Sequence, residues 1–593
     1  MAKTISPAPS EWQELRPPLP EGCRQVAEWL AARVPDDVEL YVRPHLNGLR
    51  PSIVLLSEKH GMTVLDVIEA SIVVERWRRG LNGALVRGSH AEPQRVRLDP
   101  NARAEYVRDD VLNVYCPRLG AAAKRDASLA GRLAVYVVFP FDSCAEVHHV
   151  CDRHLARGKE ILRDAPDEIM PWRQSRAAPL DARMVSDLRN WLVEPDVEAQ
   201  KRRPIHLNPK QEELAYRRTQ SGYRRIKGPP GSGKSQVLAT RAAVLAGHEL
   251  QVLVVTYNIT LRHYLRDLID RASRGGVRSH ITITNFHDWL RDLCRNAQLS
   301  QQLKEAWAQD IEAADDAQRG LAIGRQALAV LGNDARGYDA VLVDEGQDFE
   351  LEWWNLLCGV VREDGEHVLV ADTGQDLYDR SENWTDVGMT GAGFTGPWAT
   401  LTGSYRIPRR IHPAIVRLAR SLQVERVDLD QGDQQEQFDL TEIRWIETSP
   451  ENFVDEVARA VATMPTLSDP DPTAYADVFL LVQTHARGLK AVERLEQLRI
   501  SVGHVFGETS ADSRRRKLWF MQDDARVKAT TVHSFKGWES RALVVAVDRF
   551  TTRTDRMEVY IALTRLKTSD LTSYLTIVNC APPFSGFRAV LDC

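Results

Sequence analysis

The most restrictive feature of this sequence is the stretch GPPGSGKS at residues 228–235, which fits the pattern GxxxxGK[ST]. It follows a strand pattern, RRIKG, and precedes a helical pattern, QVLATRAAVLA. In that setting, backbone N–H groups of a glycine-rich loop can cradle phosphate groups at the N-terminus of the helix. Lys234 would then reach the outer phosphates, and the hydroxyl of Ser235 would ligate Mg²⁺. A glycine turn without chemical meaning is the alternative, which the complete motif disfavours. The loop glycines expected near the phosphates are Gly228, Gly231 and Gly233.

A second stretch, VLVDEGQD at residues 341–348, places acidic residues directly after an apolar strand pattern. Burying charge is costly, so carboxylates at the mouth of a buried strand need a purpose. Asp344 lies where nucleotide-hydrolysing folds place a magnesium-binding acid, and Glu345 is placed to orient or deprotonate an attacking water. A solvated acidic loop is the alternative, but such a loop would not need an apolar strand before it.

Strand and helix patterns alternate around both motifs and predict an α/β fold. The strand patterns are mostly apolar, as expected for parallel sheets that helices cover on both faces. The chain has 593 residues, too many for a single core. We predict an N-terminal α/β domain at 1–165, a linker at 166–205, a first lobe at 206–395 with a short helical insert at 289–337, and a second lobe at 396–593. The strands predicted for the two lobes are RRIKG, QVLVVTY, HITITNF, DAVLVDE, HVLVADT, ADVFLLVQT, VKATTVHS and RALVVAVD.

Further short stretches between residues 207 and 567 follow one another in an order typical of a known family. They are LNPKQ, TYN, TNFH, DEGQD, VADTGQDLY, GSYRIP, TVHSFKGWES and VYIALTRLK. Together with the phosphate loop, they resemble the motifs of superfamily 1 helicases of the UvrD/Rep/PcrA kind. The resemblance implies two RecA-like P-loop NTPase lobes, hydrolysis of ATP with Mg²⁺, and movement along single-stranded nucleic acid. It further implies DNA as the strand and 3′ to 5′ as the direction.

The same resemblance implies a role for each matching residue. Gln211 would read the adenine, and Gln375 would sense the γ-phosphate. Gly537 and Glu539 would lie near the nucleotide. The residues that would contact the nucleic acid are Thr256, Asn258, Thr284, His287, Tyr378, Thr531 and His533.

Two arginines, Arg406 and Arg565, match positions of arginine fingers. Phosphoryl transfer builds negative charge on the equatorial oxygens, and arginines donated from a second lobe can stabilise that charge. An arginine taken singly is more often a surface salt-bridge partner. Their motif context favours the finger role, in which ATP binding closes the cleft between the lobes and hydrolysis releases it.

The chain departs from the family in ways that bear on its activity. Only residues 508–525 separate SVGHVFG from RVKATTVHS, where the family carries a large accessory domain. Translocation is therefore a safer expectation than processive unwinding of duplex. The residues after Tyr378 lack the family's aromatic-rich continuation, so Trp384, Phe286 and Trp289 are the candidates for stacking on bases. Each of the three is more often a packing aromatic.

The N-terminal region resembles nuclease-related (NERD-type) domains of the PD-(D/E)xK fold, through PSIVLLSEKHGMTVLDVIE at residues 51–69. Ser52 stands where the family has a metal-binding Asp, and Asp66 and Ile68 stand at the ExK positions, so the lysine is missing. A metal site needs a cluster of oxygen ligands. We therefore expect a domain that does not cleave nucleic acid, and an unrelated α/β domain is the alternative. An active helicase–nuclease would require that Glu58, Asp66 and Glu69 rebuild a metal site.

Net charge, cysteine usage and hydropathy exclude several classes. Formal net charge is -5, so nucleic acid would have to bind at local patches such as SRRRK at 513–517. Eight cysteines without a CxxC pair fit reduced thiols in a cytoplasm. Apolar runs are too short to span a membrane, and the N-terminus lacks the apolar core of a secretory signal. The stretch CAEVHHVCDRH at 144–154 matches no common zinc module.

The sequence thus predicts an ATP-dependent motor on single-stranded nucleic acid, with the N-terminal domain as a reader, docking platform or regulator. A nuclease-like domain beside such a motor resembles bacterial anti-phage or DNA-repair systems, so a partner nuclease or a defence or repair protein is expected. The main alternative is a nucleotide-gated switch, which uses ATP to control a partner without travelling along a strand.

Overall fold

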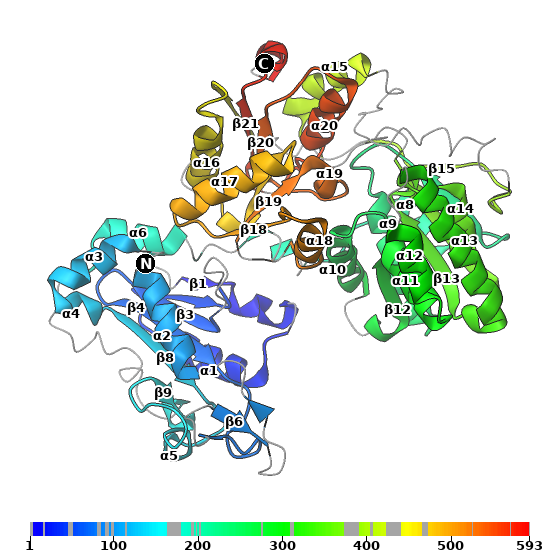
Figure 1. Cartoon of the computed structure of the whole chain (residues 1–593). Helices are drawn as coiled ribbons and strands as arrows, with labels where there is room; N and C mark the ends of the chain where they lie inside the picture. The colour runs from blue at the N-terminus through cyan, green and yellow to red at the C-terminus, as the bar shows by residue number, and fades with distance from the viewer. Residues whose placement is uncertain are drawn as a thin grey trace.

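A computed structural model of the 593-residue chain contains three sheet-based units (Figure 1). We call them the N-terminal unit, the first sheet unit and the second sheet unit, which comprise the described residues up to 192, from 203 to 403 and from 407 to 591. The structure describes residues 4–15, 18–44, 51–79, 85–88, 94–95, 100–112, 116–162, 179–190, 192, 195–196, 199–200, 203–273, 277–308, 313–372, 391–403, 407–422, 440–464, 473–522, 524, 526–569 and 571–591.

The N-terminal unit is built on a mixed six-stranded sheet with the order β1-β2-β3-β4-β8-β9. Helix α1 covers one face of this sheet, and α2, α3 and α6 cover the other. The sheet strands are β1 (Ile5–Ser6), β2 (Glu39–Val42), β3 (Ile53–Ser57), β4 (Gly61–Val67), β8 (Leu133–Val138) and β9 (Ala156–Arg157). A small second sheet consists of β5 (Arg78–Arg79), β6 (Leu85–Arg87) and β7 (Gln94–Arg95). The helices are α1 (Glu21–Arg33), α2 (Pro100–Asp110), α3 (Pro117–Arg125), α4 (Ala127–Ala130), α5 (Cys144–Val147) and α6 (Ala182–Asn190).

The first sheet unit holds a six-stranded sheet in the order β12-β11-β13-β14-β10-β15, and every strand pair in it is parallel. Its strands are β10 (Tyr223–Lys227), β11 (Val252–Thr256), β12 (Ile281–Asn285), β13 (Tyr338–Asp344), β14 (Val361–Ala371) and β15 (Ala399–Thr400). Its helices are α8 (Pro209–Tyr216), α9 (Lys234–Gly247), α10 (Leu261–Ser273), α11 (Phe286–Asn296), α12 (Ser300–Ala308), α13 (Ala313–Leu331) and α14 (Leu351–Cys358).

Alternating side chains of the central strands explain why helices cover both faces of this sheet. Side chains along a strand point to opposite faces in turn. Val252 and Val254 of β11 pack in one core with α9 and α10, whereas Leu253 and Val255 pack in another core with α11, α13 and α14. Both faces of the strand are therefore apolar, which is the uniform pattern that predicts a parallel sheet from the sequence.

The second sheet unit repeats this plan with the order β16-β21-β20-β17-β19-β18, again with parallel pairs throughout. Its strands are β16 (Thr441–Glu447), β17 (Val478–Val482), β18 (Val502–His504), β19 (Val527–Thr531), β20 (Ala542–Val547) and β21 (Ser573–Asn579). Its helices are α15 (His412–Ser421), α16 (Phe453–Thr463), α17 (His485–Gln497), α18 (Ser510–Leu518), α19 (Val532–Phe535), α20 (Arg553–Leu563) and α21 (Arg588–Leu591).

These sheets confirm the mixed α/β class and the eight strands predicted for the two lobes. Helix α6 lies within the segment that the sequence suggests is a linker, yet Val185 and Leu188 of this helix are buried in the core of the N-terminal unit. Among the described helices, none is long and apolar enough to cross a membrane.

Candidate nucleotide site

The glycine-rich loop joins β10 to α9 and adopts a backbone that only glycine adopts easily. Gly231 and Gly233 have φ values of 81° and 83°, in the left-handed region. A Cβ on Gly233 would lie 2.4 Å from Nε2 of Gln211. That amide donates a 2.9 Å hydrogen bond to the carbonyl of Ser232, so Gln211 braces the loop from α8. The predicted adenine reader therefore lies beside the phosphate loop.

Lys234, the first residue of α9, is held by acceptors around the loop. Its Nζ donates to the carbonyls of Gly228 and Pro229 at 2.7 and 2.9 Å. It also lies 3.4 Å from Oδ2 of Asp372, which follows β14. Because β14 is the neighbour of β10 in the sheet, Asp372 comes to the loop through the parallel register. The ammonium group of Lys234 therefore lies along the loop, where it could bind a phosphate.

Ser235 and Asp344 meet at the carboxyl edge of the sheet, as the sequence predicts for a magnesium site. The hydroxyl of Ser235 donates a 3.0 Å hydrogen bond to Oδ2 of Asp344, which ends β13. Strand β13 is separated from β10 only by β14. A serine hydroxyl and a carboxylate at hydrogen-bond distance are oxygen donors of the kind that Mg²⁺ takes beside phosphates.

Glu345 has a strained backbone next to this pair. Its φ of 55° and ψ of 43° are left-handed, which costs a residue with a side chain about 1–3 kcal/mol. The Gln347 side-chain amide donates to the Glu345 carboxylate, and the same side chain accepts from the backbone N–H of Asp372. Backbone strain of this kind persists where surrounding contacts stabilise it. Here the contacts of Gln347 stabilise it and fix the orientation of the Glu345 carboxylate.

The pKa values of the two neighbouring carboxyl groups, Asp344 and Glu345, are shifted in opposite directions. Burial, and next the charge of Glu345, raises the pKa of Asp344 to about 7. Burial also opposes ionisation of Glu345, but the charges of Lys536, Arg565 and Lys234 outweigh it and lower the pKa of Glu345. A carboxylate kept ionised beside a phosphate loop can accept a proton from a water molecule.

The second sheet unit supplies the opposite wall of the site. A cavity of about 580 Å³ is lined by the phosphate loop, Glu345 and Asp372 on one side and by Gly537, Glu539 and Arg565 on the other. Gly537 has a φ of 87°, and a Cβ there would lie 3.0 Å from Oε1 of Glu345. Most of the predicted nucleotide residues that the structure describes therefore line one cavity. Gly228 and Asp344 are described but are not among its lining residues.

Polar groups join the two sheet units beside the cavity. Nζ of Lys536 lies 2.7 and 2.8 Å from the carboxylate oxygens of Asp348, and each side chain is 3% exposed. The amide of Asn258 donates to the carbonyls of Ser534 and Lys536 at 2.9 and 3.3 Å. Thr260 donates to Ser534 at 2.7 Å. Hydrogen bonds thus join the loop after β11 to α19 and the residue that follows it.

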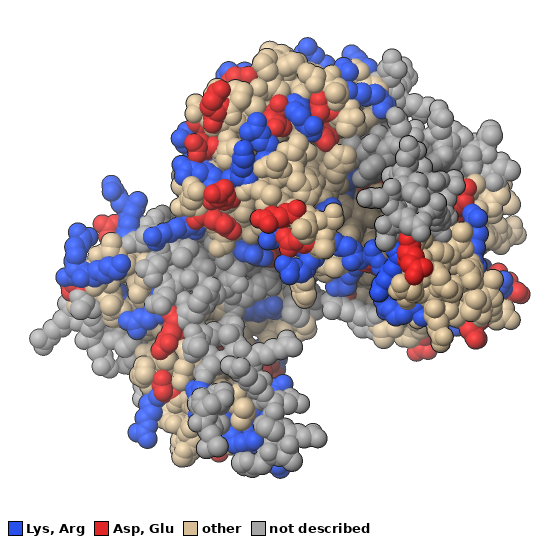
Figure 2. All heavy atoms as spheres, in the orientation of Figure 1, with Lys and Arg blue, Asp and Glu red and all other residues tan. Residues whose placement is uncertain are grey.

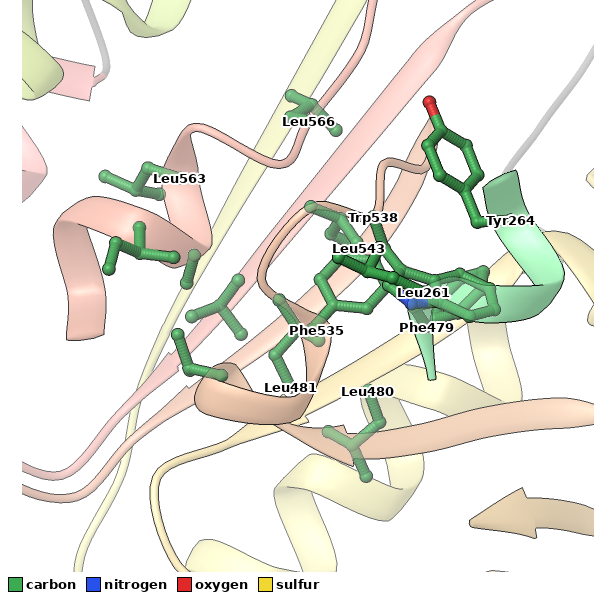
Figure 3. Packing of buried hydrophobic residues seen from close by; sticks show 14 of the residues in the cluster. Leu261, Tyr264, Phe479, Leu480, Leu481, Phe535, Trp538, Leu543, Leu563 and Leu566 are labelled. Atoms are coloured by element: carbon green, nitrogen blue, oxygen red, sulfur yellow. The ribbon is translucent and has the colours of Figure 1, made fainter. Parts of the chain in front are cut away.

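Apolar contacts surround these polar groups (Figure 3). Leu261 and Tyr264 of α10 reach across to Trp538 and Phe479 of the second sheet unit. The rings of Tyr264 and Trp538 are stacked with centroids 6.2 Å apart. The junction between the units is therefore a packed core with a cavity at its side.

The residues predicted to contact nucleic acid are placed in several different environments. Thr256 is buried at the end of β11, and Thr531 caps α19 by accepting from the backbone N–H of Ser534. Thr284 is buried and donates to the carbonyl of Asn285. His533 is 35% exposed and lies 2.9 Å from Glu558. His287 contacts the rings of Tyr257, Phe286, Trp307 and Trp353.

Two aromatic candidates for base stacking pack in the core, which is the alternative role given for them from the sequence. Phe286 and Trp289 are 1% and 5% exposed in the core beneath α11, and Phe286 stacks on Trp353 with centroids 4.4 Å apart. Neither presents a free face to a base, because helical spacing turns both toward the sheet. The third aromatic candidate and three predicted site residues lie outside the described residues: Trp384, Gln375, Tyr378 and Arg406.

Basic side chains gather on the surface where α18 and α10 approach each other (Figure 2). Arg514 of α18 pairs with Asp288 of α11, and Arg262 of α10 shares that carboxylate at 3.3 Å. Arg515 and Arg516 pair with Asp512 within α18. The stretch predicted as a local basic patch thus bridges the two sheet units and is partly neutralised by aspartates.

Sequence patterns did not single out several residues that line the cavity. Asp372 follows the apolar strand pattern HVLVA just as Asp344 follows VLV, so the same signal could have found it. Arg203, Tyr264, Arg271 and Lys567 also line the cavity. They come from the residues before α8, from α10 and from the segment between α20 and β21, and no local pattern brings such segments together.

The N-terminal unit places its nuclease-like residues in structural roles. Ser52 accepts a 2.9 Å hydrogen bond from the backbone N–H of Val67. Glu69 accepts from the backbone N–H groups of Gly22 and Cys23, at the start of α1. Ile68 packs against the core of the unit. Among the described residues, no group of three or more His, Cys, Asp or Glu side chains is arranged to hold a metal ion, and this includes the stretch at 144–154.

In comparisons with known proteins, no family model matches the chain and no curated protein matches it.

Proposed function

We propose that the chain is an ATP-driven motor on single-stranded nucleic acid, and that its two parallel-sheet units are RecA-like lobes. The observation that carries this proposal is a cavity that both units line. Lys234, Ser235 and Glu345 enter it or border it from the first sheet unit, and Arg565 enters it from the second. A site divided in this way links the chemistry of one nucleotide to the relative position of two units.

The residues present fit ATP with Mg²⁺. Ser235 and Asp344 would hold the metal ion, because their oxygens already lie 3.0 Å apart at the edge of the sheet. When bound, Mg²⁺ would neutralise charge on the phosphate oxygens. Lys234 would exchange its bonds to the loop carbonyls for the outer phosphates. Gln211 would lie near the base while it braces the loop.

The catalytic roles follow from the electrostatics of the cavity. Glu345, kept ionised by Lys536, Arg565 and Lys234, accepts a proton from the attacking water. Arg565 stabilises the charge that develops on the transferring phosphoryl group. Because Arg565 belongs to the second sheet unit, loss of the γ-phosphate removes part of the attraction between the units. Opening and closing of the junction then accompanies each turnover.

The loops that join the two units offer a route from the nucleotide to the strand. Asn258 and Thr260 follow β11 and bind the carbonyl of Ser534. Ser534 belongs to the segment that also carries His533 and Lys536. We assign the motifs TYN and TVHSFKGWES to contact with the strand. A shift of Lys536 relative to Asp348 would therefore move backbone groups of both of these motifs. Backbone-directed contacts of this kind bind a strand without reading its sequence.

The N-terminal unit is proposed to be a non-cleaving platform. Ser52 and Glu69 already serve backbone N–H groups, which leaves them as structural acceptors. The full chain, incubated with labelled single-stranded and duplex DNA or RNA in Mg²⁺ and then in Mn²⁺, should leave both uncut. Cleavage that Asp66→Ala abolishes would instead identify an active helicase–nuclease.

The deciding experiment measures ATP hydrolysis by the purified chain with no nucleic acid, with single-stranded DNA, with single-stranded RNA and with blunt duplex. Stimulation by single strands and loss of hydrolysis in Lys234→Ala are expected, together with little unwinding of blunt duplex. Lys210→Ala, an exposed lysine paired with Glu213, is the control. Hydrolysis that no nucleic acid stimulates, without stepping along a labelled strand, would favour the nucleotide-gated switch.

A further inference from the structure

Arg271 lines the nucleotide cavity from α10 and belongs to none of the sequence motifs. It follows Tyr264 by seven residues, which places both side chains on one face of the helix. Tyr264 projects along the junction beside Trp538 (Figure 3). The cavity therefore extends along α10 for two helical turns, from the junction core to the end of the helix.

The guanidinium of Arg271 has few partners for its position. Within the part of the chain that the structure describes, its hydrogen bond is the one from Nε to the carbonyl of Arg203, at 3.3 Å, and it has no ion pair. An arginine has five N–H donors, and this partly buried side chain uses one of them in that bond. Burial accordingly lowers the pKa of Arg271. The remaining donors are available to a ligand in the cavity.

The carbonyl that binds Arg271 belongs to a connector, which we define as residues 203–208. Its residues Arg203 and His206 also line the cavity, as does Gln200 earlier in the chain. The connector ends at Asn208, whose side chain accepts from the backbone N–H of Gln211 at the start of α8. Arg271 and the connector therefore form a continuous wall that reaches the predicted base-reading residue.

The two ends of the cavity differ in chemistry. Lys234, Glu345 and Arg565 define the end where phosphates would lie. The hydrogen bond of Arg271 runs instead to the connector, and the acids whose charges act on it include Glu539 rather than Glu345. A planar guanidinium can stack on a purine or donate to ribose and ring acceptors.

We propose that Arg271 is a nucleotide-binding residue for the base and ribose of ATP, and that the connector closes this end of the site. The inference rests on the proposed ATP site and adds to it a contact with the nucleoside. It assigns to α10 a binding role in addition to its packing against the second sheet unit.

The test compares ATP with tripolyphosphate, which lacks the nucleoside. Arg271→Ala should raise the KM for ATP about tenfold, the loss expected for one charge-assisted hydrogen bond. The value of kcat and inhibition by tripolyphosphate should stay near those of the wild type. Arg336→Ala is the matched control, because Arg336 belongs to the same unit and forms an exposed pair with Glu363.

Each outcome decides the matter. An unchanged KM in Arg271→Ala would overturn the inference while the ATP site stands. Equal weakening of ATP and tripolyphosphate would place Arg271 at the phosphates and overturn it too. Absence of ATP hydrolysis and binding in the wild type would refute the proposed function and the inference together. If Arg271→Ala fails to fold, Arg271→Gln provides the same comparison with less side-chain volume lost.

Discussion

The two parallel-sheet units share one architecture and differ at their carboxyl edges. Each has six parallel strands with helices on both faces, and each buries apolar side chains on alternate sides of the strands. At its carboxyl edge the first unit presents a glycine-rich loop and the acids Asp344, Glu345 and Asp372. The second presents Arg565 to the same cavity, and its Lys536 pairs with Asp348 of the first unit.

The difference shows where the chemistry of this chain is encoded. Apolar strands specify a parallel sheet in both units, but they say nothing about which side chains follow the strands. The first unit supplies binding and proton acceptance, and the second supplies cations. Neither edge alone would complete the site that we propose, so the cavity depends on the contact between the units.

Removing the contribution of the second unit should have the largest effect. Arg565→Ala is expected to lower the rate of ATP hydrolysis by about 10³ to 10⁵, the range known for arginine fingers, while ATP affinity falls little. The same result is predicted from the sequence for Arg406→Ala. Single-turnover hydrolysis and equilibrium binding of a fluorescent ATP analogue separate the two quantities.

Arg556→Ala, on α20 shortly before Arg565 in the chain, is the control for Arg565. It carries the same substitution and should leave both rate and binding near the wild-type values. Loss of binding and rate to the same extent in Arg565→Ala would point to a structural role, and the second unit would then be a support rather than a chemical partner.

Changing the first unit at its strained carboxylate comes next. Glu345→Gln keeps the shape of the side chain but cannot accept a proton, so turnover should fall by about 10² to 10⁴. ATP should still bind and hold the junction closed. Quench-flow measurement of hydrolysis checks the turnover, and a filter-binding assay checks the affinity for ATP. Glu352→Gln, at an exposed position in the first turn of α14, is the control. Wild-type turnover in Glu345→Gln would remove this residue from the chemistry.

Much of the first unit's edge is predictable from the sequence because it is encoded locally. The phosphate loop, Asp344 and Glu345 follow directly from strands that their own residues specify. The interaction of Asn258 with Ser534 and Lys536 is not predictable in this way, because it joins residues 276 and 278 positions apart. The sequence could assign this asparagine to a motif but not to the junction between the units.

The linker region shows the same limit. The segment ARMVSDLRNWL has a helical pattern in the sequence, and the structure gives its helix a buried face in the N-terminal unit. Four residues beyond Leu192, Asp196 pairs with Lys567 of the second sheet unit at 3.0 Å. Composition rich in Pro and Arg predicted a spacer, but the contact that fixes its end depends on a lysine far along the chain.

Breaking the ion pair between the units should have an intermediate effect. Lys536→Met leaves Asp348 buried without its cation, which costs about 3–5 kcal/mol in other proteins. We expect weaker contact between the units, seen as a larger radius of gyration in small-angle scattering, and a rise in the pKa of Glu345 as one of its cations is lost. Turnover should therefore fall and its optimum should move to higher pH.

Lys210→Met is the matched control for the ion pair, because Lys210 and Glu213 are about half exposed and pairs of that kind contribute little. The double variant Lys536→Met with Asp348→Leu removes both charges and should recover part of the compactness. An unchanged radius in Lys536→Met would mean that the apolar contacts of α10 alone hold the units together.

The smallest predicted effect compares a buried histidine of the first sheet unit with a half-buried histidine of the second. Burial lowers the pKa of His367 in the first unit and of His504 in the second to about 4. His367 stacks on Tyr223 with centroids 4.1 Å apart, and Nε2 of His504 lies 2.9 Å from Nη1 of Arg516. Protonation of His504 would remove the acceptor for Arg516. Protonation of His367 would add charge to its stack with Tyr223.

These folded-state pKa values lie below the value of about 6.5 for an unfolded histidine. Both neutral rings therefore contribute their full stability above pH 6.5, and that contribution is lost as the pH falls from 6.5 toward 4. With allowance for solvent screening, about 1 kcal/mol should be lost per ring at pH 5. His367→Phe keeps the stacking ring without the titration, so it should reduce the drop in Tm between pH 7.5 and pH 5 measured by calorimetry. His504→Phe should help less, because it also deletes the acceptor for Arg516 at neutral pH. An equal acid sensitivity in the wild type and in His367→Phe would show that other groups control the acid stability of the first unit.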